Sequence, residues 1–448
     1  MTTPVLLTLS IALLAGLLLS RFAKKLGLPA VTAYLIAGII IGPSLLGRLG
    51  IGFNDIEGSY QYYENYGILK DLALGFIAFA IGNEFRVSQL KKIGKQATVI
   101  GIFQAVFTCV VVDIVLIGFS LIVGPDVFPM SAAIVLGAVA TATAPAATLM
   151  VVRQYKAKGP LTDLLLPIVA LDDAVGLVIF AVSFGVAKSI DAGAVDIIAM
   201  VVNPILEVVL SIGLGAAMGA LFTVCEKHFH SNSKRIAVSV AFVMATVAIS
   251  GVNFHLGAVH VAFSSLLACM MLGTVFCNIC DFSEDLMDRA EKWTAPLLVI
   301  FFVLSGAELD FTIFSEGIFV LIGVIYIIFR SIGKYFGAGL SARMTSCDAN
   351  TCKYLGITLL PQAGVALGMA SMAKSDPVLG STKVGMIVQS ITLFAVLIYE
   401  IFGPYLTKIA LTKAGDIKPE ERVSRRTHDK KNKKHLEDVA VEVTANNN

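Results

Sequence analysis

Two adjacent aspartates, Asp172 and Asp173, lie inside the apolar stretch ALDDAVGL at residues 170–177. A carboxylate surrounded by hydrocarbon is costly, and such acids commonly bind ions or carry protons. Burial and the neighbouring like charge both disfavour ionisation, so the pair would hold a proton near neutral pH and titrate as a unit. A bound monovalent cation would favour the ionised form and expel that proton. The pair therefore predicts cation/proton exchange, unless the aspartates, Asp172 especially, only cap helix ends.

The composition places this chemistry in a membrane. Of 448 residues, 56% are hydrophobic and only 15% are charged, and the mean hydropathy is +0.83. Soluble domains carry about 25% charged residues, and a membrane-spanning helix needs roughly 20 apolar residues. We expect an all-α polytopic membrane protein with about 13 transmembrane helices. The predicted segments are 4–21, 29–46, 67–83, 97–123, 129–152, 161–187, 197–225, 236–254, 258–279, 294–309, 317–341, 353–373 and 383–409.

Basic residues predict the orientation. Lys and Arg concentrate in the first loop and every second loop after it, and the side rich in these residues faces the cytoplasm. We therefore expect an integral protein of the cell (inner) membrane with its N-terminus outside and its C-terminus inside. Residues 1–410 would form the transport domain. Residues 411–448 would be a disordered basic tail that touches membrane lipid at most, so a regulatory domain would be a separate subunit. Nothing predicts a nucleic-acid partner.

The two halves of the chain resemble each other. The motif LIAGIIIG (35–42) aligns with LLACMMLG (266–273), and IGNEF (81–85) aligns with SGAEL (305–309). Pro145 and Pro361 interrupt corresponding apolar stretches. The first six segments therefore pair with the last six, with 197–225 as a linker helix, and the two units begin on opposite sides of the membrane. This pattern predicts an inverted-topology repeat, which is common in secondary transporters.

Each repeat contains one predicted broken helix. Proline removes a helix hydrogen bond, so Thr141-Ala-Thr-Ala-Pro145 and Pro361-Gln362-Ala-Gly364 should interrupt their segments. The freed carbonyls, the Thr143 hydroxyl and less directly the Thr141 hydroxyl could coordinate a cation beside the aspartates. Two crossing broken helices would also place helix-dipole ends near the membrane midplane. The alternative is a pair of ordinary proline kinks.

Other buried charges fall on predicted helices. Arg330 and Lys334 lie four residues apart, on one helix face. Either could pair with the aspartates, although Lys334 could instead extend its ammonium to the cytoplasmic surface. Asp113 and Glu400 are further acids within apolar segments. They could balance helix dipoles or basic residues, or act as secondary ion sites.

Two other classes of protein fit the pattern poorly. An intramembrane aspartyl protease needs acids on separate helices, whereas these two are adjacent, and a passive channel does not need titratable acids at its centre. We therefore expect neither an enzyme nor a cofactor. The seven cysteines suit apolar packing, and Cys277 and Cys280 lack the second ligand pair that a zinc site would need.

Over about residues 1–410 the chain resembles the monovalent cation/proton antiporter superfamily, the branch with bacterial sodium/proton antiporters and potassium-efflux proteins. The resemblance rests on RFAKKLGLPAVTAYLIAGIIIGPSLLG, FIAFAIGNEF, TATAPAA, PIVALDDAVGLVIF, GKYFGAG and LLPQAGVALGMA. It implies a homodimer that serves pH homeostasis. A dimerisation scaffold would comprise segments 1–3 and 8–10, and a core that moves like an elevator would comprise segments 4–6 and 11–13. It also implies that Asp173 is the main carrier, with Asp172 assisting, Thr143 as a ligand and Lys334 as their cationic partner.

Departures from the family pattern bear on the ion. Ala144 stands where many members have serine, so one hydroxyl ligand is missing. Potassium-efflux members usually carry Gln–Asp at the position of Asp172-Asp173. The aspartate pair in place of Gln–Asp favours exchange of Na⁺ for protons, with K⁺/H⁺ antiport or K⁺ efflux as the alternative. The aspartate pair with a lysine favours electrogenic exchange, and Arg330 keeps electroneutral exchange open.

Overall fold

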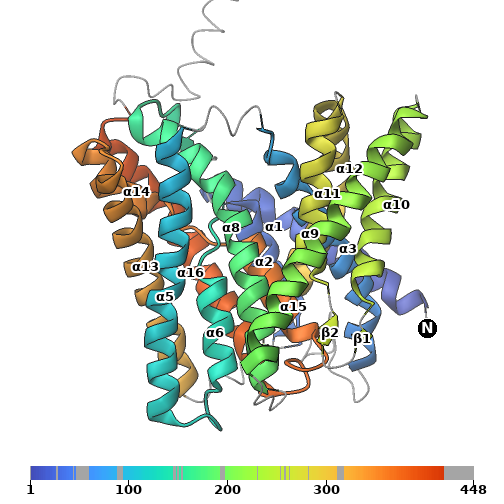
Figure 1. Ribbon diagram of the computed structural model, residues 1–448, viewed down its shortest axis with the longest axis horizontal. Helices are drawn as coiled ribbons and strands as arrows, with labels where there is room; N and C mark the ends of the chain where they lie inside the picture. The colour runs from blue at the N-terminus through green and yellow to red at the C-terminus, as the bar shows by residue number, and fades with distance from the viewer. Residues whose placement is uncertain are drawn as a thin grey trace, which may run out of the picture.

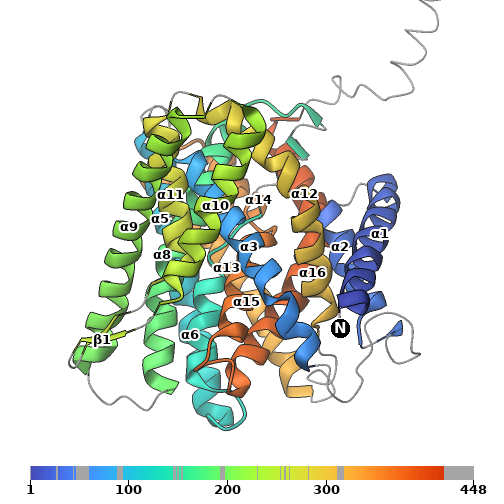
Figure 2. The same ribbon diagram turned by 90° about the vertical axis from the view of Figure 1, so that its right-hand side faces the viewer.

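The computed structural model describes residues 2–26, 29–43, 45–46, 60–87, 94–144, 148, 151–152, 155–191, 197–229, 231–252, 254–256, 259–261, 263–280, 282–309 and 317–417. Long helices stand side by side and run mostly along one direction, the vertical of Figures 1 and 2. Pro145 and the tail beyond residue 417 lie outside the described residues, so the predictions made for them stay predictions.

The chain builds this bundle from helices joined by short connections. The first part contains α1 (Thr2–Leu26), α2 (Ala30–Ile41), α3 (Tyr60–Glu84), α5 (Lys95–Val123), α6 (Met130–Val139), α8 (Pro160–Asp191) and α9 (Ile197–Lys227). The second part contains α10 (Asn232–Ser250), α11 (Ser265–Ile279), α12 (Ser283–Ala307), α13 (Gly317–Met344), α14 (Ala349–Thr358), α15 (Gly364–Ser375) and α16 (Lys383–Ala414). Each predicted apolar segment contains helix, which confirms the all-α class.

The boundary predicted between the eighth and ninth segments is wrong. Two short antiparallel strands, β1 (Phe254–Leu256) and β2 (Val259–Val261), occupy residues predicted as helix ends. The next helix begins only at Ser265, where the Ser264 hydroxyl accepts a hydrogen bond from the Leu267 amide. Such a cap satisfies an amide that the first helical turn leaves open. The apolar run therefore begins before the helix does.

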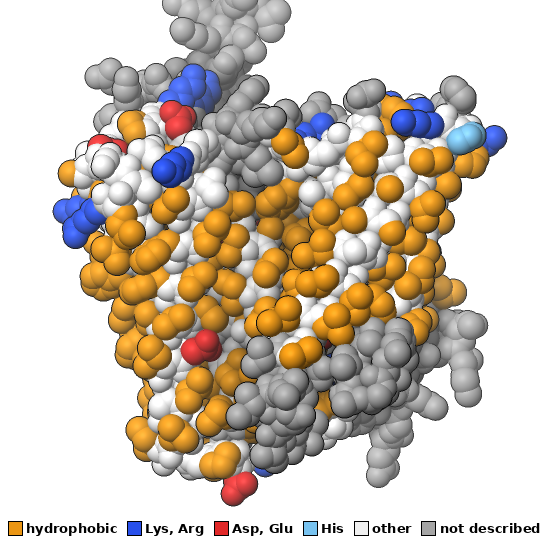
Figure 3. All heavy atoms as spheres, viewed as in Figure 1, with side chains coloured by type: hydrophobic (Ala, Val, Ile, Leu, Met, Phe, Trp, Pro, Cys, Tyr) orange, Lys and Arg blue, Asp and Glu red, His pale blue; other side chains and the backbone are white. Residues whose placement is uncertain are grey.

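The surface is that of a protein surrounded by lipid. Within the described part of the chain, eight helices are long and apolar enough to cross a membrane, and four shorter helices are also apolar. Large apolar side chains point outward along them, such as Ile114, Leu121 and Ile122 of α5. Figure 3 shows hydrophobic side chains over the middle of the molecule and Lys and Arg gathered at its upper edge. The helices α5, α8, α10 and α12 begin at this upper edge, which we call the basic end.

Two helix pairs pack without room for side chains between them. In α2 and α12, a Cβ at Gly38 or at Gly306 would overlap a main-chain carbonyl of the facing helix. In α3 and α11, the same holds for Gly82 and Gly273. Backbones that approach this closely gain dispersion contacts in lipid, where no hydrophobic effect drives helices together. These four helices therefore form two tightly joined pairs.

Candidate functional site

The site lies where two interrupted helices cross. Helix α6 ends at Val139 and α14 ends at Thr358, and α15 begins only at Gly364, which confirms the predicted break around Pro361. The two breaks meet directly, because the Ala144 amide donates to the Pro361 carbonyl at 2.8 Å. The main chain between the half-helices leaves carbonyls without helical partners. Positive side chains of α13 supply those partners.

Arg330 of α13 binds the crossing through its whole guanidinium group. Its three nitrogens donate to the carbonyls of Ala140 at 3.0 Å, Leu360 at 2.8 Å and Ala142 at 2.6 Å. The guanidinium also lies 4.4 Å from the centre of the Tyr399 ring, and the side chain is fully buried. A positive charge at the C-terminal ends of half-helices compensates their dipoles. Arg330 therefore holds both interrupted helices together.

Lys334, one turn further along α13, binds Asp172 instead. Its ammonium lies 2.7 Å from a carboxylate oxygen of Asp172, and both side chains are fully buried. The same ammonium donates to the Thr141 carbonyl at 2.5 Å and to the Thr143 hydroxyl at 2.9 Å. A buried charge is tolerable when it is paired and hydrogen-bonded in this way. The two cations of α13 thus have separate partners.

Asp172 receives donors on both of its oxygens. The Gln104 amide of α5 donates to one oxygen, and the Thr143 hydroxyl and Lys334 donate to the other. The Thr143 hydroxyl also lies 3.3 Å from the Leu359 carbonyl. Gln104 was missed from the sequence, where the only signal was an amide inside the apolar run FQAVFT. Asp172 therefore contacts α5, α13 and the first interrupted helix, and Thr143 connects it to the second.

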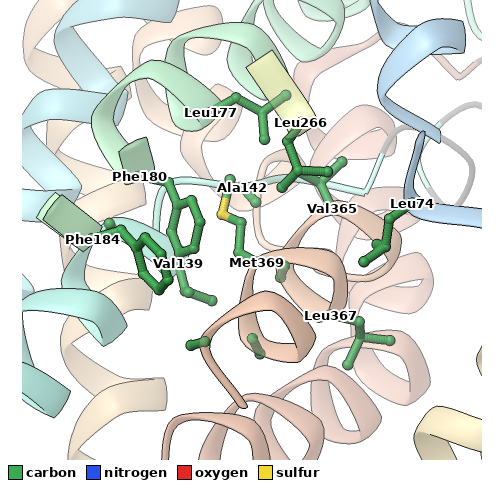
Figure 4. Packing of buried hydrophobic residues seen from close by; sticks show 14 of the residues in the cluster. Leu74, Val139, Ala142, Leu177, Phe180, Phe184, Leu266, Val365, Leu367 and Met369 are labelled. Atoms are coloured by element: carbon green, nitrogen blue, oxygen red, sulfur yellow. The ribbon is translucent and has the colours of Figure 1, made fainter. Parts of the chain in front are cut away.

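Asp173 belongs to a different face of α8, because successive residues of a helix point about 100° apart. The side chain is 3% exposed. Leu177 lies one turn later on the same face and lines a small pocket with Leu74 of α3, Leu266 of α11 and Gly364 and Gly368 of α15. Figure 4 shows Leu177, Leu74, Leu266 and Val365 around this space. Asp173 thus lies one helical turn before a residue that faces α3, α11 and α15, whereas Asp172 contacts α5 and α13.

The other predicted side chains occupy less central places. The Thr141 hydroxyl donates to the Ala138 carbonyl at 2.7 Å, so its main-chain oxygen, not its hydroxyl, meets Lys334. The Gln362 amide donates to the Val139 carbonyl at 2.9 Å and to the Tyr326 hydroxyl at 3.0 Å. Both residues stabilise the crossing. Tyr326 and Tyr399 were also missed, since a tyrosine in an apolar helix resembles ordinary core.

The two further acids lie apart from the aspartate pair. Asp113 follows Gln104 by nine residues on α5, which is about 13 Å along a helix. It accepts a hydrogen bond from the Cys109 thiol at 3.3 Å and packs against Gly137. Glu400 of α16 accepts from the Thr32 hydroxyl of α2 at 3.4 Å. Within the described part of the chain, the other oxygen of Glu400 has no hydrogen-bond partner.

The arrangement suits a hard monovalent cation. The ligand atoms available here are carboxylate, hydroxyl and carbonyl oxygens, and hard cations prefer such oxygen ligands to thiols and imidazoles. Among the described residues, no group of three or more His, Cys, Asp or Glu side chains could hold a metal ion. All seven cysteines are free thiols. A carboxylate can hold either a proton or a cation, and here the ammonium of Lys334 lies beside one.

Comparison with known proteins agrees with this chemistry. The family model described as "Sodium/hydrogen exchanger, transmembrane" matches residues 9–412. The chain is 24% identical to the high-affinity Na⁺/H⁺ antiporter NhaS3 of Synechocystis, covering 68% of this chain and 71% of that protein. It is 22% identical to the K⁺/H⁺ antiporter subunit KhtU of Bacillus subtilis, covering 89% and 91%.

One solved structure shares the fold along almost its whole length. The sodium/proton antiporter MjNhaP1 of Methanocaldococcus jannaschii, determined at pH 8, superimposes with a TM-score of 0.68. The alignment covers 92% of this chain and 99% of that one at 17% sequence identity. At this identity the likeness concerns the fold alone.

Proposed function

The chain belongs to the sodium/hydrogen exchanger family, and we propose that it exchanges Na⁺ for protons at Asp173. The family places it among secondary transporters of cations and protons, which are membrane proteins without a cofactor and are not enzymes. Within that class, the choice of Na⁺, the carrier residue and the moving parts are our proposals.

The observation that carries the proposal is the different surroundings of the two aspartates. Asp172 already receives donors from Gln104, Thr143 and Lys334, so its negative charge is compensated. Asp173 lies on the face that leads to the pocket between α3, α11 and α15. A cation that enters from this side would meet the Asp173 carboxylate first. Asp172 then positions the site, and Asp173 carries the cation or the proton.

Competition at one carboxylate couples the two ions. A proton bound to Asp173 neutralises the negative charge that attracts a cation. A bound cation stabilises the ionised carboxylate and so favours release of the proton. Lys334 contributes a buried positive charge that Asp172 compensates. Arg330 is occupied by three carbonyls, so we assign the pairing role to Lys334 alone. Two protons per cation require a second proton carrier besides Asp173, so the electrogenic exchange that we favour over electroneutral exchange requires Asp172 or Lys334 also to release a proton when the cation binds.

We further propose the division into scaffold and core that the sequence predicts. The pair α2–α12 and the pair α3–α11 correspond under the proposed inverted repeat. The aligned residues Gly82 and Gly306, each of which faces a main-chain carbonyl of the partner helix, support it. Arg330 and Gln362 join α13 to both interrupted helices, which supports a core of α5, α6, α8 and α13 to α16 that moves as one body. In a homodimer, the scaffolds would meet while each core carries its ion past them.

The basic end supports the proposed orientation in the inner membrane. Lys and Arg gather there (Figure 3), at the ends that face the cytoplasm under the positive-inside rule. The N-terminus would then lie outside and the tail beyond residue 417 inside. The relative KhtU is described as a subunit, which supports the idea that a separate regulatory chain acts on this protein.

Exchange of K⁺ for protons is the second candidate. It is favoured by the K⁺/H⁺ antiporter subunit KhtU, which aligns with more of this chain than NhaS3 does. The two candidates share the site and differ in the radius of the ion that its oxygens surround. Dehydrating the smaller Na⁺ costs more than dehydrating K⁺, but a pair of carboxylates attracts the ion that approaches more closely the more strongly, and we propose that this attraction exceeds the extra cost.

Purified protein in proteoliposomes with an imposed pH gradient and an internal pH dye tests the proposal. Adding Na⁺ should collapse the gradient, and Li⁺, K⁺ and Rb⁺ added separately should do so less effectively. Collapse by K⁺ alone would support the second candidate, and no collapse by any of the four ions would refute both. The Lys334→Gln variant should carry less charge per transported ion at unchanged cation affinity, and an unchanged charge per ion would refute its assigned role.

A further inference from the structure

A buried ion cluster lies at the end of the bundle opposite the basic end, where α12 stops. Glu308 follows the last residue of α12, and its side chain is only 4% exposed. Burial of a carboxylate requires compensating partners. Here those partners come from helices on both sides of the proposed boundary between scaffold and core.

The two oxygens of Glu308 face different partners. One oxygen binds the ammonium of Lys70 from α3, which belongs with α12 to the proposed scaffold. The other oxygen accepts a hydrogen bond from the Gln389 amide of α16 at 2.6 Å and lies 3.7 Å from the ammonium of Lys374 at the end of α15. Both α15 and α16 belong to the proposed core. One carboxylate therefore bridges the two bodies.

Two other ion pairs lie within the proposed core and do not bridge it to the scaffold. Lys188 of α8 lies 3.0 Å from Asp376, which follows α15, so both partners belong to the proposed core and can move together. Lys334 and Asp172 also stay within one body. The contacts of Glu308 to Gln389 and Lys374 join residues that must separate when the core moves, whereas its contact to Lys70 need not change.

We propose that Glu308 is a latch that closes the outer end of the transport path, released from the core and kept on the scaffold in each transport cycle. The inference rests on the proposed movement of the core. With the latch closed, α15 and α16 are held against α3 and α12 at their outer ends, and the pocket beside Asp173 is shielded from that side. Opening it exposes the carboxylate of Glu308 to water while Lys70 still compensates its charge.

A crosslink across the latch tests this directly. In a background with the seven native cysteines replaced by serine or alanine, Glu308→Cys/Gln389→Cys joins scaffold to core, and Lys70→Cys/Glu308→Cys joins two scaffold helices as the matched control. Both are treated in proteoliposomes with a short bifunctional methanethiosulfonate reagent and then with dithiothreitol. We expect crosslinking of the first pair to reduce exchange to the background rate and dithiothreitol to restore it, while the control pair keeps its full rate.

Three results would overturn the latch. They are continued exchange after complete crosslinking of the first pair, equal loss in both pairs, and failure of the first pair to crosslink in the purified protein. Exchange by the same proteins before crosslinking reports on the proposed function separately. If cysteine at position 308 impairs folding, Gln389→Leu keeps the Glu308–Lys70 contact. It should speed external maleimide labelling of Val365→Cys several-fold, and an unchanged labelling rate would contradict the proposal.

Discussion

Removing one partner of the Asp172–Lys334 pair should destabilise the protein more than removing both. The ammonium and carboxylate lie 2.7 Å apart with neither side chain exposed. In Asp172→Asn, Lys334 keeps two neutral acceptors, the Thr141 carbonyl and the Thr143 hydroxyl, but loses its counter-charge. Breaking a buried pair in this way costs about 3 to 5 kcal/mol. The remaining acceptors favour the lower end of that range.

Thermal unfolding in detergent, followed by circular dichroism, measures this cost. Scaling the average unfolding entropy per residue to a chain of 448 residues gives about 0.9 kcal/mol per degree, so the midpoint should fall by roughly 3 to 5 °C. The unfolding midpoint of the Lys334→Gln variant should fall by a similar amount. The midpoint of the double variant Asp172→Asn/Lys334→Gln should fall by less than that of either single variant, because the double variant leaves no unpaired charge. A double variant that loses the full sum would refute the direct pairing.

Three further predictions concern other parts of the fold. Thr143→Val should raise the Na⁺ concentration for half-maximal exchange several-fold while Thr143→Ser keeps it near wild type, in the same proteoliposome assay. Gly38→Ala should lower the midpoint of unfolding, because its Cβ would overlap the Val303 carbonyl, whereas alanine at an exposed helix position should not. Hydrogen bonds from Thr351 lower the pKa of the Asp348 carboxyl, so the cap that this carboxylate forms on α14 stabilises the fold above the ordinary pKa of aspartate and stops doing so as the pH falls through the lowered pKa. Asp348→Ala should therefore lower the free energy of unfolding by about 1 kcal/mol at neutral pH and by little in strong acid. An equal loss at both pH values would contradict the cap.

Local patterns predicted the elements because each depends on neighbours in the sequence. Apolar runs marked the helices, and Pro361 marked the break that the structure places between Thr358 and Gly364. The start of α11 was missed because the apolar run extends back through β2, and only the Ser264 cap marks the helix itself. Hydropathy measures whether a residue suits lipid or protein interior and does not separate a helix from a hairpin.

The partners within the site could not be predicted, because they depend on contacts between distant segments. Arg330 and Lys334 share a helix face, and either could have met the aspartates. Because they lie one turn apart along α13, Arg330 reaches three carbonyls and Lys334 reaches Asp172. Gln104 joins the site from 68 residues away, with no periodic signal in the sequence. The role of Asp173 as carrier, the dimer and the moving core stay predictions.

The central claim is that Asp173 carries the ion and Asp172 positions it. The most direct test measures sodium-22 uptake and proton release together in proteoliposomes for Asp173→Asn and Asp172→Asn, each checked for folding by its unfolding midpoint. We predict that Asp173→Asn abolishes both fluxes with a midpoint near wild type, and that Asp172→Asn lowers the midpoint and weakens but does not abolish exchange. Coupled exchange that survives unchanged in Asp173→Asn would contradict the account.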